Sequence, residues 1–277
     1  MYHSALVALN ARGGNEVVSQ TAIDLAVRQH LQLSAIAVVD PSAVAPPEAV
    51  PLGATAYKKR HDDTLKTQAH EEAQRELDAF AQRCGASGIA CELALREGPI
   101  EDEIARAVQG ADLLVIGHGD GTENEGARAD VQRLDQMLRA SARPCLVVPG
   151  PAEEVRRVLV AYDGSLQSGR ALYDFALSGL WQDRPVDVLT LAADSSPAAE
   201  TAERGAAYLR THGYAAEARP MIARYQEAKH ILEFVQESGA GVLVMGAHGT
   251  PHWRSFVVGT VTRSLLQEAA VPVLVSH

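Results

Sequence analysis

The sequence predicts an α/β fold made of two tandem, doubly wound domains, each built on a five-stranded parallel sheet. The chain has 277 residues, which is enough for two domains of about 140 residues. Short β-branched strands alternate with segments of helical i, i+3, i+4 spacing, as at residues 23–27 and 231–235. The same series of elements occurs twice, so we expect one domain in residues 1–150 and a second in residues 151–277.

Four strand segments of the first domain have counterparts in the second. They are 5–10 with 158–163, 38–40 with 192–194, 111–117 with 240–246, and 142–148 with 270–276. The offset falls from about 154 residues at the second match to 129 at the third, a difference of 25. The first domain therefore carries extra residues after its second strand. We place them in a Pro-rich loop at 41–52 and in a longer helix from about Tyr57 to Cys84. The join lies near Gly150, between two prolines.

Composition narrows the classes of function. Apolar residues make up 47% and aromatic residues 5% of the chain, which favours a full core with Val-rich central strands over a β-sandwich. The net charge of −10 argues against nucleic acid and anionic membranes as partners. No apolar run approaches the ~18 residues of a membrane span, and the N-terminal residues lack the basic region of a signal peptide. Three cysteines without metal spacing favour a reduced, cytoplasmic protein.

A glycine motif follows the apolar strand segment 242–245. Gly246 and Gly249 are followed, after nine further residues, by Gly259-Thr260 and a helical pattern. Glycine lets a backbone approach a ligand closely, and a Gly-Thr pair opening a helix offers N–H groups and a hydroxyl to phosphate. The strand at 158–161 runs into Asp163-Gly-Ser, a carboxylate followed by a helix N-cap. Together they predict a nucleotide site at the carboxyl ends of two parallel strands.

This motif and the Asp-Gly-Ser segment resemble the universal stress protein family, in which the motif marks the members that bind ATP. The resemblance covers nearly the whole chain, since the pattern occurs twice. It implies a Rossmann-like, adenine nucleotide α-hydrolase-like fold with strand order 3-2-1-4-5, and ATP, with Mg, as the ligand. In that order the last strands, 144–148 and 272–276, lie at sheet edges. We expect them to pair as an internal pseudo-dimer; further self-association into a homodimer is left open.

The resemblance assigns nine positions of the second domain to the nucleotide: Ala161, Asp163, Ala192, Met245, Gly246, Gly249, Gly259, Thr260 and Val261. Residues 246–249 would line the ribose and α-phosphate, and residues 259–261 would hold the β- and γ-phosphates. Met245 would border the base and sugar, and Asp163 would bind the nucleoside or help place Mg. The two alanines would flank adenine, and they are smaller than the family's usual residues.

The first domain departs from this pattern. Asn10 stands where the second domain has Asp163, and about Val131-Gln132 stand in place of the Gly-Thr pair. The loop 120–126 is acidic, and carboxylates beside a phosphate site oppose binding. We therefore expect that this domain does not hold ATP, and the role of its loop is left open.

Several residues have a structural interpretation beside the functional one. Asp163 is also suited to a turn before Gly164, with Ser165 as helix N-cap. His248 and His252 are four apart, but Pro251 interrupts the segment and no third ligand is evident, so no metal site is predicted.

No catalytic motif is evident, and no lysine is placed to grip phosphate, so the sequence favours ATP binding with at most slow hydrolysis. We expect a nucleotide-dependent regulator of a stress response that acts on an unknown protein partner. One alternative is an interaction protein that never uses ATP. A less favoured one is an adenylating nucleotidyltransferase, which would require a Ser-Gly-Gly type of loop after its first strand.

Overall fold

The computed structural model describes residues 1–11, 13–46, 55–117, 134, 136–150, 154–247 and 260–276. The strands are β1 (Ser4–Leu9), β2 (Gln32–Val39), β3 (Cys91–Glu97), β4 (Leu113–Gly117), β5 (Cys145–Val148), β6 (Val158–Ala161), β7 (Val186–Ala192), β8 (Ala216–Ile222), β9 (Val242–Gly246) and β10 (Val273–Ser276). The helices are α1 (Glu16–Gln29), α2 (Pro41–Val44), α3 (Thr55–Ala86), α4 (Ile100–Ala107), the 3₁₀ turn η1 (Val108–Gly110), α6 (Leu166–Ser178), α7 (Ser195–Thr211), α8 (Glu227–Ser238) and α9 (Thr260–Glu268). Residues 136–140 are also helical.

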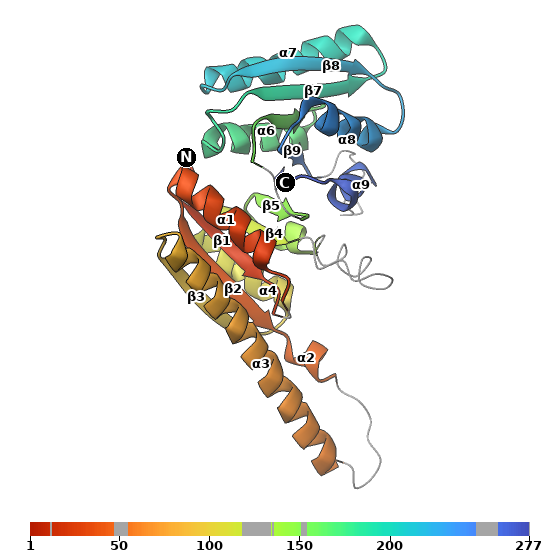
Figure 1. Ribbon diagram of the computed structural model, residues 1–277. Coiled ribbons are helices and arrows are strands. Elements are labelled where there is room, and N and C mark those ends of the chain that lie inside the picture. Colours follow the sequence, from red (N-terminus) through yellow and green to blue (C-terminus); the bar gives the residue numbers. More distant parts are fainter. Residues whose placement is uncertain are drawn as a thin grey trace.

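The strands form a single sheet in the order β3-β2-β1-β4-β5-β10-β9-β6-β7-β8. The first five strands, in what we call the N-terminal half, follow the order 3-2-1-4-5, and the C-terminal half repeats it as β8-β7-β6-β9-β10. Figure 1 shows the two halves one above the other, in red to yellow-green and in green to blue. The predicted fold class, two tandem doubly wound five-stranded sheets, is confirmed.

The two halves join through their last strands. β5 and β10 pair antiparallel, with Leu146 opposite Leu274 and Cys145 opposite Val275. All other strand pairings among the described residues are parallel. The predicted pairing of the last strands is thus confirmed, and it removes two apolar sheet edges from water.

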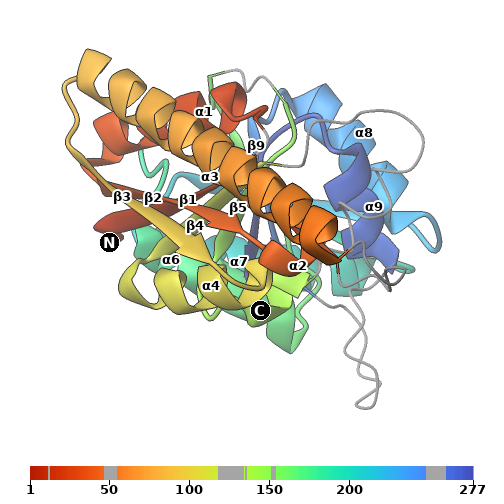
Figure 2. The same cartoon turned by 90° about the horizontal axis from the view of Figure 1, so that it is seen from below.

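Apolar residues fill both faces of this sheet. One core cluster joins α1, α3, α6 and α7 to the sheet, and the other joins α4, α8, α9 and the helical residue Leu138 to the opposite face. Figure 2 shows the N-terminal half of the sheet from below, with α1 and α3 on one side of β3-β2-β1-β4 and α4 on the other. Parallel strands covered on both faces are apolar throughout, which explains the Val- and Leu-rich runs such as Leu113–Gly117.

The extra residues of the N-terminal half follow β2, as the repeat offset predicts. Helix α3 has 32 residues, against 17 in α7, its counterpart in the C-terminal half. Its buried residues are Ala73, Leu77, Phe80 and Cys84, all in its C-terminal part, and Figure 1 shows the other end extending beyond the sheet. The predicted loop at 41–52 instead begins with the short helix α2, because Asp40 caps it and Pro41 starts it. Among the described helices none is both long and apolar enough to cross a membrane.

Candidate functional site

The carboxyl ends of β6, β7 and β9 bring together five of the nine predicted site residues. β6 lies between β7 and β9, and Val160 pairs with Val244, which places Ala161 beside Met245. Gly246 ends β9 and Ala192 ends β7. Asp163 follows β6 by two residues. This edge, where the chain leaves β6 and β9 toward opposite faces of the sheet, is the switch point at which doubly wound folds bind ligands.

Helix α9 contributes Thr260 and Val261. β9 and β10 are parallel, so the intervening chain must run back along the sheet and α9 must begin on the side of the strands' carboxyl ends. Thr260 is its first residue and is exposed, while Val261 is half-buried against the core. The start of this helix, with Thr260, therefore lies at the same edge of the sheet as the predicted site. Gly249 and Gly259 lie outside the described residues.

Asp163 is tied into the start of α6. Its Oδ1 accepts hydrogen bonds from the Ser165 backbone N–H at 2.9 Å and from the Ser168 hydroxyl at 2.6 Å. Partial burial opposes ionisation, but the bonds from the two serines outweigh it and lower the pKa of Asp163. The carboxylate is thus charged at neutral pH. Ser165 is the N-cap, accepting from the Ser168 N–H at 3.2 Å, as the sequence indicates.

Gly246 has a packing role in addition to any ligand role. A Cβ atom there would lie 2.5 Å from the carbonyl carbon of Gln167 and 2.7 Å from the backbone nitrogen of Ser168. The end of β9 therefore touches the first turn of α6 backbone to backbone, which only glycine allows. Met245, next to it, is 5% exposed and belongs to the core cluster that includes α8 and α9.

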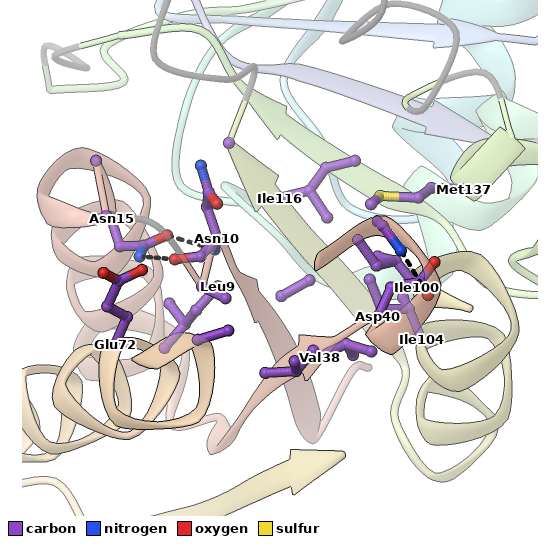
Figure 3. Close-up of a pocket in the computed structure, with 18 of the residues that line it drawn as sticks. Leu9, Asn10, Asn15, Val38, Asp40, Glu72, Ile100, Ile104, Ile116 and Met137 are labelled. Carbon is purple, nitrogen blue, oxygen red and sulfur yellow. Dashed lines mark hydrogen bonds between the residues drawn. The ribbon is translucent and has the colours of Figure 1, made fainter. Parts of the chain in front are cut away.

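A second crevice lies at the corresponding edge of the N-terminal half, where the sequence predicts a site that does not hold ATP; the cavity itself was not predicted. It is a cavity of about 180 Å³ above the ends of β1, β2 and β4. Figure 3 shows apolar side chains on its walls, Asn10 and Asn15 on one side, and Asp40 on the other. The signals that could have indicated it are the insertion after β2 and the Gly13-Gly14 pair in the loop after β1.

The β1–α1 loop beside this cavity is fixed by Asn15. Its side chain accepts from the Asn10 N–H at 2.8 Å and donates to the Asn10 carbonyl at 2.7 Å. It also donates to Glu76 of α3 at 2.9 Å. Asn15 is 3% exposed, so the long helix of the insertion holds the loop through a buried polar contact.

The geometry defines an α/β protein of Rossmann-like topology. A family model, that of the universal stress protein family, matches residues 154–277. These residues of the C-terminal half are thus similar to the universal stress protein family.

Similar proteins extend the likeness. A universal stress protein of Synechocystis is 28% identical over 165 residues, covering 59% of this chain and 57% of that relative. The chain thus spans little more than half of that relative's length. A solved universal stress protein from Archaeoglobus fulgidus has 18% identity and a TM-score of 0.69, with 98% of this chain and 95% of that chain covered. A functionally unknown protein from Pseudomonas aeruginosa has 15% identity and a TM-score of 0.61, covering 99% and 92%. At these identities, both structures are similar in fold.

Proposed function

We propose that this protein is an ATP-binding universal stress protein with one competent site, in the C-terminal half. The observation that carries the proposal is the meeting of three features at one sheet edge. These are the ionised Asp163 beside β6, the glycine that ends β9, and the exposed Thr260 that opens α9. A helix N-terminus and closely approachable backbone suit phosphates, and an acid at the end of a first strand suits a nucleoside.

ATP would lie across the ends of β6 and β9 in this proposal. The N–H groups of α9 and the Thr260 hydroxyl would bind its terminal phosphates, together with Gly249 and Gly259. Asp163 would accept a hydrogen bond from the sugar or help place Mg. Ala161 and Ala192, both half-buried at strand ends, leave room for a base beside them.

The N-terminal half is proposed not to bind ATP. Asn10 replaces the acid, and the equivalent of Gly259-Thr260 is absent from its sequence. Asp40 lies at the end of β2 and serves as the N-cap of α2, accepting from the Ser42 N–H at 2.8 Å.

ATP binding would act as a regulatory signal in the cytoplasm. Helix α9 leads directly into β10, and β10 pairs with β5 of the other half. A ligand held at the start of α9 therefore lies one helix away from the junction of the halves. If two arrangements of this junction differ in affinity for ATP, ATP shifts the balance between them and so the surface offered to a protein partner. Hydrolysis, if it occurs, is proposed to be slow.

An ATP-independent interaction protein is a second candidate. It is favoured by the local roles of Asp163 and Gly246, since capping and close packing alone account for both residues. The two candidates differ in whether nucleotide accompanies the protein.

Mass spectrometry of small molecules released from freshly purified full-length protein tests the proposal. We expect ATP or its diphosphate from the wild type and neither from Gly259→Glu, whose carboxylate would intrude on and repel phosphate. Gly239→Glu is the control, because a Cβ at Gly239 would meet nothing within 4 Å and this residue ends α8, away from the site. Because Gly239 has a positive φ of 65°, Gly239→Glu is expected to lose some stability. The control is valid if this variant still retains nucleotide. Wild-type protein free of nucleotide that also fails to bind added ATP would support the second candidate.

A further inference from the structure

The C-terminal half enters helix α8 through a longer loop than the one that leads into α4 in the N-terminal half. The two loops begin in the same way, because the first residue after the strand donates its N–H to the end of the neighbouring strand. Gly98 bonds to the Val39 carbonyl at 3.1 Å, and Ala223 bonds to the Ala192 carbonyl at 2.9 Å. A single residue then leads into α4, whereas residues 224–226 lead into α8. The loop of the C-terminal half therefore carries additional residues at the carboxyl edge.

The longer loop presents an aromatic side chain. Tyr225 lies in it and is 80% exposed. The next residue, Gln226, has φ 60° and ψ 40°, in the left-handed region that residues other than glycine seldom adopt. Gln226 is the N-cap of α8, yet it makes no side-chain hydrogen bond to the helix. Helix capping thus does not account for this loop, and uncommon backbone conformations of this kind cluster at ligand sites.

The N-terminal half shows what this part of the fold borders. There Ile100, the first residue of α4, and Ile104 line the cavity together with Val38 of β2. Figure 3 shows these three side chains around one space. In the C-terminal half the start of α8 takes the place of the start of α4, and the end of β7, with Ala192, takes the place of the end of β2. The loop before α8 therefore borders the edge at which the proposed nucleotide lies.

Helix α8 also packs beside the helix that is proposed to bind phosphate. Ile231 and Val235 of α8 share one core cluster with Leu265 and Leu266 of α9, so both helices cover the same face of the sheet. Each helix leads into a parallel strand and must therefore begin at the carboxyl edge. Figure 1 shows the two helices next to each other. A nucleotide with its phosphates at Thr260 can thus extend its base toward β7 and the start of α8.

We propose that Tyr225 stacks on the base of the bound nucleotide and supplies a large part of its affinity. The inference rests on the proposed function and deepens it, because it names the residue that recognises the base. Ala161 and Ala192, which are expected to flank adenine, offer little surface to a planar ring. Tyr225 provides the aromatic face that the two alanines lack, and its exposure leaves that face accessible to a ligand. Since every base has such a face, the contact favours a nucleotide over a free polyphosphate.

Calorimetric titration of ATP with Mg into full-length, nucleotide-free protein tests this stack. Tyr225→Ala should weaken binding about tenfold, which is within the range for the loss of a base–aromatic stack. Tyr225→Phe keeps the ring and should bind within about twofold of the wild type. The control Tyr173→Ala removes another exposed tyrosine, on α6 at the opposite face of the sheet, and should leave the affinity unchanged.

A second measurement separates stacking from a structural role of the loop. In the wild-type complex, nuclear Overhauser effects should connect the adenine protons to a tyrosine ring, and Tyr225→Phe should remove them while the affinity is retained. Equal affinity of the wild type and Tyr225→Ala would overturn this inference alone. So would a Tyr225→Phe variant that binds as weakly as Tyr225→Ala, because the hydroxyl and not the ring would then make the contact. A wild-type protein that binds no ATP would overturn the proposed function, and this inference with it.

Discussion

The two halves of this molecule share the same strand order, but the edges at the carboxyl ends of their strands differ. In the N-terminal half five residues, 10–14, separate β1 from the N-cap of α1; in the C-terminal half three residues, 162–164, separate β6 from the N-cap of α6. The longer loop is fixed by Asn15, which also bonds to Glu76 of the long helix α3. The shorter loop is fixed by Asp163, whose carboxylate accepts hydrogen bonds from serines at the start of α6.

The close contact between strand and helix differs as well. At Gly246 a Cβ would meet the backbone of α6 at 2.5 Å, whereas at the equivalent Gly117 the nearest atom is the Cβ of Val18 at 3.8 Å. The helix after the first strand thus lies against β9 in one half and further from β4 in the other. In the N-terminal half the cavity opens at this edge and is lined by Gly117 itself.

This difference shows how little the sheet constrains the site. Both halves bury the same kind of apolar strands and pair them in the same order, so the strand pattern is satisfied in each. The loops at the carboxyl edge do not take part in strand pairing, so their sequences can diverge between the halves. Binding residues of α/β folds lie in these loops.

The largest expected effect concerns what the halves share. Leu274 is 1% exposed and pairs with Leu146 at the junction. Leu274→Ala should lower the free energy of unfolding by about 2–5 kcal/mol through lost burial and an added cavity. Urea denaturation followed by circular dichroism measures it. Leu177→Ala, at a position 40% exposed, should change stability by no more than about 0.5 kcal/mol. Equal effects of the two variants would contradict the assigned role of the junction.

The next prediction compares equivalent glycines in the two halves. Gly246→Ala should destabilise the protein by about 1–3 kcal/mol, because the added methyl group meets backbone atoms that cannot rotate away. Gly117→Ala should be close to neutral, within about 0.5 kcal/mol, because its Cβ makes only an ordinary contact with Val18. Thermal unfolding of the pair is the comparison, and similar losses in both would mean that the two edges are packed alike.

A smaller difference is expected between the two helix starts. Asn15→Ala leaves the backbone groups of Asn10 and the Glu76 carboxylate without this partner, which should cost about 1–3 kcal/mol. Ser165→Ala removes a cap from an accessible helix end and should cost about 1 kcal/mol. If Ser165→Ala proved the more damaging in chemical denaturation, the buried contact between loop and α3 would be of minor importance.

The smallest effect is a dependence on pH. The folded state lowers the pKa of Asp163, so its contribution to stability is complete above the pKa of an unfolded aspartate, about 3.9, and is lost as pH falls through the lower folded value. Asp163→Asn should therefore flatten the acid limb of a stability profile measured from pH 6 to pH 2. A second variant, Asp112→Asn in the N-terminal half, tests the same effect, because hydrogen bonds from His3 and Ser4 outweigh burial and also lower the pKa of Asp112. It should flatten the same limb, and an unchanged profile in both variants would contradict the assigned hydrogen bonds.

The sequence predicted the sheet well because strand and helix patterns are local and the repeat supplied their order. It placed the long helix of the first half to within two residues of α3 at each end, since apolar spacing at Leu77, Phe80 and Cys84 marks its buried part. It did not predict the N-terminal cavity, because part of its wall comes from α2 and α3, through Ala43 and Glu72, and the position of these helices over the sheet is not a local property of the sequence. Nor did it predict the contact of Gly246 with Gln167, which depends on the distance between a helix and a strand from different segments.

The central claim is that the two edges differ in function, and the number of ATP molecules bound per chain tests it most directly. Isothermal titration calorimetry with ATP and Mg on full-length, nucleotide-free protein should give one site per chain for the wild type. The same titration of Gly259→Glu should give none, since the N-terminal edge is not expected to bind ATP. Two sites in the wild type, or one site retained in Gly259→Glu, would contradict the account.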